Sequence, residues 1–214
     1  MTLTDTTTFD QLAAPYDRGM ALLERLWLRE MRRRLVPRAR GRVLEIGIGT
    51  GANLPFYRSQ ARIMAIDESP EMLRAAFQRS AALDHRAQIG QANAEHLPFP
   101  PDTFDSVVTA LVLCSVIDPN RALGEMGRVL RKPDGRLLLL EHTRPDARPL
   151  SWLADGLNIP WCAMQGRCHL NRRTPNVLVH NGFEIEHIET KLGGLFRLIV
   201  ARPDPSNQRS TTPG

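Results

Sequence analysis

Short apolar runs alternate with longer amphipathic stretches along the middle of the chain. Residues 43–46, 63–66, 106–113 and 136–141 are largely apolar, and residues 121–131 have the pattern of a helix. Apolar runs of this length are typical of strands that are covered on both faces of a parallel sheet. Their alternation with helical patterns predicts an α/β fold with a doubly wound sheet.

The first apolar run leads into a glycine-rich loop. Glu45 is followed by Gly47, Gly49 and Gly51, with glycine at every second position. These glycines let the backbone turn tightly after a strand and leave room for a ligand against the main chain. The second run ends in Asp67, and an acidic residue at this place in a nucleotide-binding sheet holds ribose hydroxyls. The pattern predicts a cofactor that contains adenosine.

Glu45 discriminates between two such cofactors. The spacing Gly47-x-Gly49-x-x-Ala52 also satisfies the dinucleotide fingerprint, so the glycines alone do not decide. A carboxylate at the strand end would repel the pyrophosphate of a dinucleotide. S-adenosylmethionine carries an ammonium and a sulfonium group and no phosphate, so Glu45 favours it.

On these residues the chain resembles the class I S-adenosylmethionine-dependent methyltransferases, whose motif I is similar to residues 43–51. The resemblance implies S-adenosylmethionine as cofactor. It also implies a Rossmann-like, doubly wound, mostly parallel seven-stranded sheet with an antiparallel C-terminal strand and an N-terminal helical lid. By the same resemblance, the residues expected to bind the adenine are Asn93, Ala94 and Glu95. Asn93 stands where aspartate is usual, and its amide oxygen can still accept a hydrogen bond from adenine.

The segment around Tyr16 resembles the cofactor lid of the ubiquinone and menaquinone biosynthesis methyltransferases. Tyr16 either covers the methionine end of the cofactor or packs as a helix aromatic. Residues 53–57 are expected to open a crossover helix, with Asn53 near the methionine group. The predicted cofactor-binding residues are Tyr16, Glu45, Gly47, Gly49, Gly51, Asn53, Asp67, Asn93, Ala94, Glu95 and Leu111.

Further pieces of the chain, 109–116, 141–142, Trp161, 166–172 and 182–183, resemble in this order the vertebrate alkyl-thiol methyltransferases of the methyltransferase-like group and their bacterial counterparts; 113–116 and 166–172 are the most discriminating. This resemblance implies a small lipophilic thiol as the acceptor. The predicted substrate-binding residues are Tyr57, Cys114, Trp161, Cys168 and Arg172. The alternatives are C- or O-methylation of a quinone precursor, N-methylation of a phospholipid headgroup, and cofactor binding without catalysis. The chain departs from the vertebrate members by lacking their apolar N-terminal membrane segment, so a soluble enzyme is expected.

Thiol methylation would need help with deprotonation, because an alkyl thiol is only slightly ionised near neutral pH. His142 and His169 are expected on loops at the edge of the sheet where ligands bind, so either imidazole is a candidate catalytic base. The alternative is that His142 only hydrogen-bonds the strand end. Arg172 would stabilise a thiolate or an anionic substrate group, or else pair with an acidic residue.

The three cysteines indicate a reducing, cytoplasmic location rather than a disulfide framework. Cys114 is expected to leave room for the substrate, and Cys168 to line the pocket. Because Cys162, Cys168 and His169 lack the spacing of a structural zinc site, we predict no metal.

The length of 214 residues suits one well-buried α/β domain. We expect an N-terminal helical lid over 1–40 and a methyltransferase domain over 41–202. Within that domain, 150–174 would form an apolar substrate lid, and 203–214 a disordered tail. No apolar run approaches the ~18 residues that a membrane span needs.

The formal net charge of +5 comes mostly from arginine, and a cluster of arginines lies at the end of the expected N-terminal helix and in the linker after it. The cluster consists of Arg29, Arg32, Arg33, Arg34, Arg38, Arg40 and Arg42. A solvated helix face is expected, and contact with a membrane surface is left open. Nucleic acid is not expected, because the chain has few aromatic residues on which bases could stack.

Overall fold

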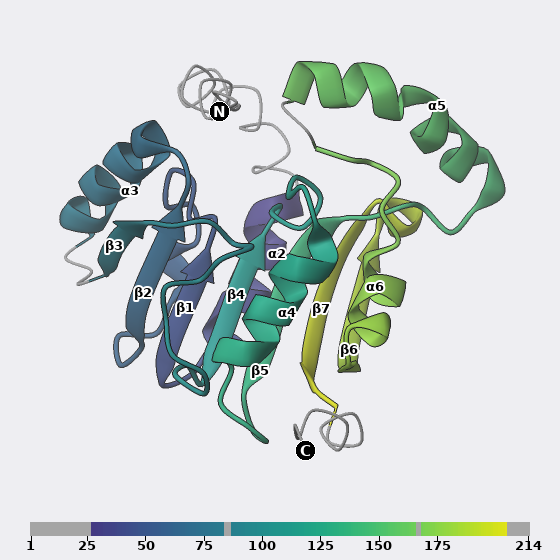
Figure 1. Cartoon of the computed structure of the whole chain (residues 1–214). Helices are drawn as coiled ribbons and strands as arrows, with labels where there is room; N and C mark the ends of the chain where they lie inside the picture. The colour runs from purple at the N-terminus through teal and green to yellow at the C-terminus, as the bar shows by residue number, and fades with distance from the viewer. Residues whose placement is uncertain (1–26, 84–86, 166–167, 205–214) are drawn as a thin grey trace, which may run out of the picture.

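Seven strands form one sheet in the order β3-β2-β1-β4-β5-β7-β6 (Figure 1). The computed structural model describes residues 27–83, 87–165 and 168–204. The strands are β1 Arg42–Ile46, β2 Arg62–Asp67, β3 Gln88–Gln91, β4 Ser106–Ala110, β5 Arg136–His142, β6 Phe183–Lys191 and β7 Phe196–Pro203. The helices are α2 Arg29–Leu35, α3 Pro70–Ala82, α4 Pro119–Val129, α5 Arg148–Gln165 and α6 Thr174–His180.

Strand direction follows the prediction. The pairs β1–β2, β1–β4, β2–β3 and β4–β5 are parallel. The C-terminal strand β7 runs antiparallel to both of its neighbours, β5 and β6. The structure therefore confirms a Rossmann-like, mostly parallel seven-stranded sheet with an antiparallel C-terminal strand.

Helices cover both faces of the sheet. Leu44 packs in a buried core with Met126 of α4, whereas its neighbour Val43 packs in a second core with Leu35 of α2. Successive side chains of a strand point to opposite faces, so this alternation marks a sheet covered on both sides. Because β1, β2, β4 and β5 run parallel, their carboxyl ends meet at one edge of the sheet.

The connection between β1 and β2 differs from the prediction. Residues 53–57 do not open an α-helix; the described chain has a single 3₁₀ turn there, Leu54–Phe56. Pro55 starts this turn, and β2 begins at Arg62. Between the end of β1 and the start of β2, the described chain therefore contains no α-helix.

Strand β4 is shorter than predicted, because it ends at Ala110 rather than at 113. Leu111 adopts a positive φ of 62°, which breaks the extended conformation. The next N–H groups bind the carboxylate of Glu141 instead of a neighbouring strand. Cys114 therefore lies in a loop beyond the strand and not at its end.

The arginine cluster is not uniformly solvated. Arg34 and Arg38 lie near Glu189, with N–O distances of 3.4 and 3.7 Å. Arg32 is only 7% exposed, and its guanidinium donates to Asn53 Oδ1 at 2.6 Å. The expectation of a solvated face is therefore wrong for Arg32, which faces inward because a buried acceptor is available.

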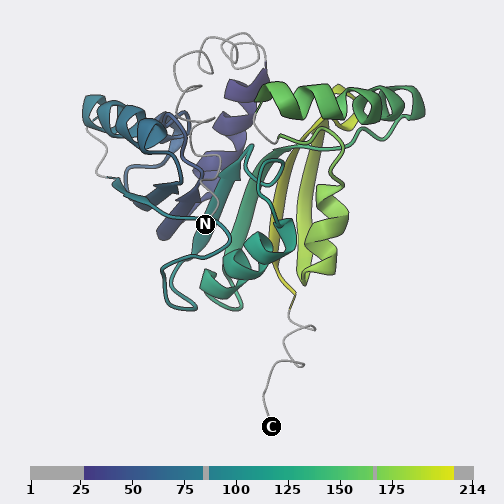
Figure 2. The same cartoon turned by 45° about the horizontal axis from the view of Figure 1, so that its top comes forward.

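Helix α5 covers much of the predicted substrate lid and lies beyond the carboxyl ends of β4 and β5 (Figure 2). Four apolar side chains of this helix are exposed: Trp152, Leu153, Leu157 and Ile159. Within the described ranges, no helix is both long and apolar enough to cross a membrane. Tyr16, most of the predicted N-terminal lid and residues 205–214 lie outside the described residues, whereas Pro203, the first residue of the predicted tail, ends β7.

Candidate cofactor and acceptor site

The glycine loop after β1 is held against β2 by its own backbone. The N–H groups of Gly47 and Ile48 donate to the carbonyl of Ile66 at 2.8 and 3.0 Å. The N–H of Gly49 donates to Asp67 Oδ2 at 2.9 Å, and Ser69 N–H donates to Oδ1 of the same carboxylate at 3.0 Å. Asp67 therefore has a fixed orientation beside the loop.

Two of the loop glycines differ in what surrounds them. A Cβ atom at Gly47 would overlap the Cγ2 atom of Val112, so packing against the loop after β4 requires this glycine. A Cβ atom at Gly49 would meet nothing within 4 Å, although its φ of +55° also favours glycine. The described residues thus leave the space beside Gly49 open, which suits the close approach of a ligand to the backbone.

Glu45 lies at the centre of a buried polar network behind the loop. Asn53 Nδ2 donates to Glu45 Oε1 at 2.8 Å, and Arg32 holds the amide oxygen of Asn53. Glu45 Oε2 and the Tyr57 hydroxyl are both buried without a hydrogen-bond partner among the described residues. Burial raises the pKa of Glu45 to about 7, although the neighbouring Tyr57, Asn53 and Arg32 side chains lower it. An unpartnered buried carboxylate oxygen fits a cofactor that carries positive charge.

The predicted adenine-binding residues form a small, closed turn. Asn93 Oδ1 accepts the N–H of Glu95 at 2.6 Å. Glu95 Oε1 in turn accepts the N–H groups of Ile117 and Asp118 at 2.9 and 3.1 Å. These bonds tie the turn after β3 to the loop after β4. The cofactor contacts of Asn93, Ala94 and Glu95 stay predictions.

Glu141 organises the same loop, and sequence reasoning missed it. Its buried carboxylate accepts the N–H groups of Val112 and Leu113, both at 3.0 Å, and of Cys114 at 3.2 Å. Burial raises the pKa of Glu141, while the three N–H donors lower it. One signal in the sequence pointed to it: a lone acidic residue directly after four leucines.

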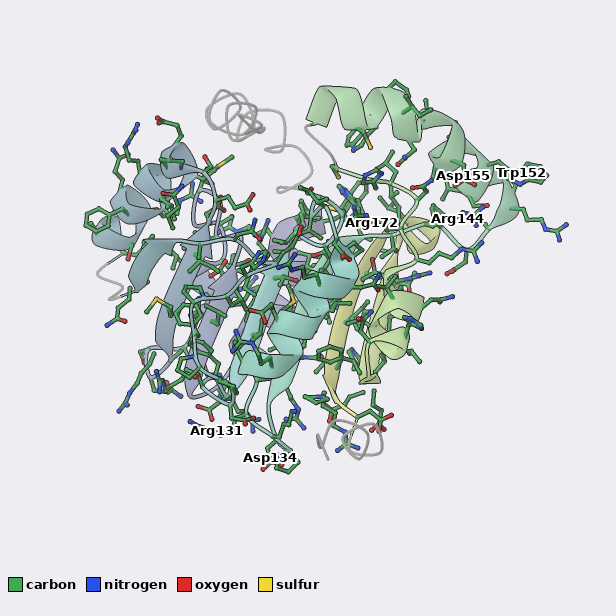
Figure 3. The ribbon with its side chains drawn as sticks, in the orientation of Figure 1. Arg131, Asp134, Arg144, Trp152, Asp155 and Arg172 are labelled. Atoms are coloured by element: carbon green, nitrogen blue, oxygen red, sulfur yellow. The ribbon has the colours of Figure 1, made fainter. Side chains whose placement is uncertain are left out.

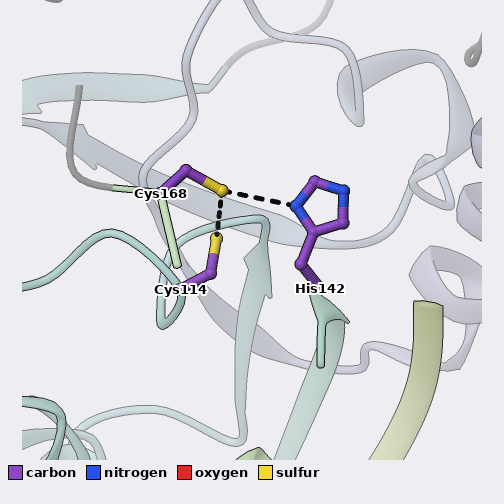
Figure 4. A group of neighbouring side chains, drawn as sticks. All are labelled: Cys114, His142 and Cys168. Atoms are coloured by element: carbon purple, nitrogen blue, oxygen red, sulfur yellow. Dashed lines mark hydrogen bonds between the residues drawn. The ribbon is translucent and has the colours of Figure 1, made fainter. Parts of the chain in front are cut away.

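Three side chains from separate segments meet at the carboxyl edge of β4 and β5 (Figure 4). Cys168 Sγ lies 3.5 Å from Cys114 Sγ and 3.4 Å from His142 Nδ1. All three side chains are buried. The neighbouring Cys114 thiol, followed by the His142 imidazole, lowers the pKa of Cys168 to about 4 although burial opposes this. The Cys168 thiol, followed by burial, raises the pKa of Cys114. We call these residues the Cys–His cluster.

Aromatic rings surround His142. Its imidazole lies 4.4 Å from the ring of Phe196 and 6.4 Å from the indole of Trp161, centroid to centroid. Trp161 is partly buried, and its indole N–H has no hydrogen-bond acceptor among the described residues. His142 is the last residue of β5 rather than the first residue of the following loop.

Arg172 fastens the segment after α5 onto the loop after β4. Its guanidinium donates to the carbonyl of Leu113 and, at 2.6 Å, to that of Val116. Among the described residues, these side-chain hydrogen bonds of Arg172 go to backbone carbonyls rather than to a carboxylate. In Figure 3 Arg172 lies among the central loops, whereas Trp152 points away from them at the outer end of α5. Burial lowers the pKa of Arg172.

The remaining predicted residues are not gathered in the Cys–His cluster. The His169 imidazole lies 3.3 Å from Asn158 Nδ2 and 3.4 Å from Cys162 Sγ through its Nδ1 atom. Burial lowers the pKa of His169. Tyr57 is buried beside Glu45, on the cofactor side. Their predicted roles in acceptor binding and catalysis stay predictions.

Comparisons with known proteins agree with this architecture. A family model described as a methyltransferase domain matches residues 44–139. The chain is 39% identical over 113 residues to a phosphatidylethanolamine N-methyltransferase of Cereibacter sphaeroides, an alignment that covers 52% of this chain and 55% of the relative. It is 38% identical over 157 residues to the ubiquinone/menaquinone biosynthesis C-methyltransferase UbiE of a Marinomonas species, covering 69% and 62% respectively. The chain thus spans less than two thirds of the length of these curated relatives.

Among solved structures, an S-adenosylmethionine-dependent methyltransferase of Thermotoga maritima has a TM-score of 0.72 at 21% identity, covering 94% of this chain and all of that one. This likeness shows a shared fold. The glycine loop, the anchored Asp67 and the unpartnered oxygen of Glu45 fit the cofactor of that fold, S-adenosylmethionine. The chain therefore carries a class I S-adenosylmethionine-dependent methyltransferase domain.

Proposed function

We propose that the protein transfers a methyl group from S-adenosylmethionine to the sulfur of a small lipophilic thiol. One observation carries this proposal. Three of the segments that resemble the alkyl-thiol methyltransferases are far apart in the sequence, and one residue from each, Cys114, His142 and Cys168, meets the others in the Cys–His cluster. Segments that together recognise one acceptor are expected to line one site.

The position of this cluster relative to the glycine loop supports an acceptor role. Val112 packs against Gly47 so closely that a Cβ atom there would overlap it. Cys114 follows Val112 by two residues, and Glu141 holds the N–H groups of both. The acceptor side and the cofactor side therefore share one rigid loop, which suits a reaction that needs alignment of two reactants.

The reaction is an in-line displacement. A lone pair of the acceptor thiolate forms a bond to the methyl carbon, and the bond from that carbon to the sulfonium breaks, with its electron pair staying on the leaving sulfur. The products are a methyl thioether and S-adenosylhomocysteine, and the thiol proton is lost to water. Phe196 and Trp161 beside His142 supply apolar surface that suits a lipophilic acceptor.

The relatives favour a second candidate. Their names describe C-methylation in ubiquinone and menaquinone biosynthesis and N-methylation of phosphatidylethanolamine. A ring carbon of a quinol precursor or the amine of a lipid headgroup would also be a lipophilic acceptor. Neither acceptor explains why two thiols and an imidazole should gather at the site.

The test is a panel assay with cofactor labelled in its methyl group. Alkyl thiols, aryl thiols, a demethylated quinol and phosphatidylethanolamine vesicles are offered separately, with Asp67→Ala as the cofactor-binding control. We expect labelled thioether from the thiols and none from the control. Labelled quinol or phospholipid without labelled thioether would overturn thiol methylation, and no product with any acceptor would overturn an enzymatic function toward these classes.

A further inference from the structure

The Cys–His cluster has the composition and dimensions of a metal site. Cys114 Sγ, His142 Nδ1 and Cys168 Sγ all lie within 4.8 Å of one another, and all three residues are buried. The two sulfurs are 3.5 Å apart, and sulfur and nitrogen are 3.4 Å apart at Cys168. Each residue offers one ligand atom.

These separations match a zinc ion. Zn–S bonds of about 2.3 Å and Zn–N bonds of about 2.0 Å in tetrahedral geometry place two sulfurs about 3.8 Å apart, and a sulfur and a nitrogen about 3.6 Å apart. Thiolate and imidazole are soft or borderline ligands that suit zinc rather than magnesium or calcium. Three protein ligands leave one tetrahedral position open, which is the arrangement of catalytic zinc sites.

The three ligand atoms are held in place by other contacts. Glu141 accepts the N–H of Cys114 at 3.2 Å, and Arg172 ties the segment that follows Cys168 to the carbonyls of Leu113 and Val116. The N–H of His169 donates to the carbonyl of Cys114 at 2.8 Å, which joins the two cysteine segments directly. A preorganised ligand set of this kind needs little rearrangement to bind an ion.

The surroundings also contain a donor suited to a metal-bound sulfur. The indole N–H of Trp161 is buried without an acceptor in the described part of the chain, and it neighbours Cys168. Ligating groups are usually hydrogen-bonded by residues outside the ligand set, which tune the charge on the metal. A disulfide between the two cysteines would leave both His142 and this N–H without a role.

We propose that Cys114, His142 and Cys168 bind one zinc ion through two thiolates and an imidazole, and that the fourth position takes the sulfur of the acceptor thiol. Cys162, Cys168 and His169 lack a zinc spacing in the sequence, but the fold assembles a different set from three segments. The metal site rests on geometry alone; its role toward the thiol rests on the proposed function.

The chemistry of the fourth position follows from the charge of the ion. A thiol that binds zinc loses its proton to water and stays as a thiolate, because the metal stabilises the negative charge. Its remaining lone pair can then attack the methyl carbon as described above. The thioether product carries no charge and binds zinc weakly, so it leaves the site.

The first experiment measures metal content. The full chain is produced without a histidine tag in zinc-supplemented medium, dialysed, and analysed by plasma mass spectrometry. We expect one zinc per chain in the wild type. Residues that only hydrogen-bond the ligands typically change metal affinity by ~10–100-fold, and the loss of zinc affinity should be larger than this in Cys114→Ser, Cys168→Ser and His142→Gln. Cys162→Ser is the matched control and should keep its zinc, because Cys162 Sγ donates to the carbonyl of Cys168 and lies outside the ligand set. Circular dichroism and cofactor affinity establish that each variant is folded.

The second experiment replaces zinc with cobalt. Thiolate-to-cobalt charge-transfer absorption should be present in the wild type and in Cys162→Ser and absent in Cys168→Ser. Adding an alkyl thiol should change this spectrum by filling the fourth position. Absence of stoichiometric zinc and of the charge-transfer band in a folded wild type would overturn the metal site. Bound zinc with no methylation of any thiol would support the metal site and overturn the proposed function instead.

Discussion

Asp67 accepts the backbone N–H of Gly49 through Oδ2 at 2.9 Å, so the acid that ends β2 also holds the glycine loop that follows β1. The second oxygen accepts the N–H of Ser69, which fixes the plane of the carboxylate. We predict that this one side chain combines two tasks: it shapes the loop, and it presents oxygens for ribose hydroxyls. Substitutions at Asp67 should therefore differ in cofactor affinity according to which of the two tasks the new side chain can still perform.

Replacing Asp67 by alanine should remove both tasks. We expect Asp67→Ala to weaken S-adenosylmethionine binding by about 2–4 kcal/mol, since charge-assisted hydrogen bonds to two hydroxyls are lost. Asp67→Asn keeps one acceptor oxygen and should lose less. Isothermal titration calorimetry measures both affinities. An unchanged affinity in the alanine variant would remove Asp67 from the cofactor site.

Gly47 and Gly49 should respond differently to a larger side chain. Gly49 faces open space, so Gly49→Val should abolish cofactor binding by filling that space while the domain stays folded, with a destabilisation of about 1–2 kcal/mol from its positive φ. Gly47→Ala should destabilise the fold more, because its Cβ atom would overlap Val112. Thermal unfolding and calorimetry together distinguish the two. A Gly49→Val enzyme with full activity would contradict the assignment of the glycine loop.

Glu45 should make the unliganded protein less stable as the pH rises. A carboxyl group whose pKa is about 7 in the folded state and 4.5 in the unfolded state binds its proton more tightly when folded. This contribution is fully present below pH 4.5 and is lost as the pH rises through 7, and it amounts to about 3 kcal/mol. Glu45→Gln should therefore gain stability relative to the wild type at pH 8 and little at pH 4.5. Urea unfolding across this range measures the difference.

Cofactor binding should have the opposite dependence on pH at the same residue. The ionised carboxylate attracts the positive charge of S-adenosylmethionine, so affinity should increase as Glu45 loses its proton between pH 6 and about 7.5. Glu45→Gln, which cannot ionise, should bind more weakly and show no such increase. A wild-type affinity that stays constant over this range, or a glutamine variant that follows the same curve, would exclude Glu45 as the group that senses the cofactor charge.

Arg172 should matter more for the acceptor side than for the cofactor. Its removal leaves the carbonyls of Leu113 and Val116 without their donor, so we expect Arg172→Ala to lower stability by about 2–4 kcal/mol. Arg172→Lys keeps the charge but cannot bridge two carbonyls, and should lower kcat/KM for the acceptor with little change in cofactor affinity. The control is Arg144→Ala, because Arg144 pairs with Asp155 at 2.7 Å near the surface, where an ion pair contributes little (Figure 3). Equal effects of both alanine variants would contradict the bridging role.

Much of the cofactor side could be predicted from the sequence. Strand, glycine loop and acid are contiguous or nearly so, and their geometry follows from local backbone preferences. The prediction failed where tertiary contacts override a local pattern. Arg32 has the sequence context of a solvated helix arginine, but the amide of Asn53, 21 residues away, supplies a buried acceptor. Leu113 has the pattern of a strand residue, but Glu141 takes its N–H.

By itself the sequence determined the fold class and the cofactor, because apolar periodicity sets which elements form and the residues of the glycine loop act as neighbours along the chain. Only the tertiary structure decided which residues meet in the Cys–His cluster. Cys114, His142 and Cys168 belong to three segments with no common local pattern, and their sulfur and nitrogen atoms meet because parallel strands bring their carboxyl ends to one edge of the sheet. Distances between such residues depend on the packing of the whole sheet, which no local stretch of sequence encodes.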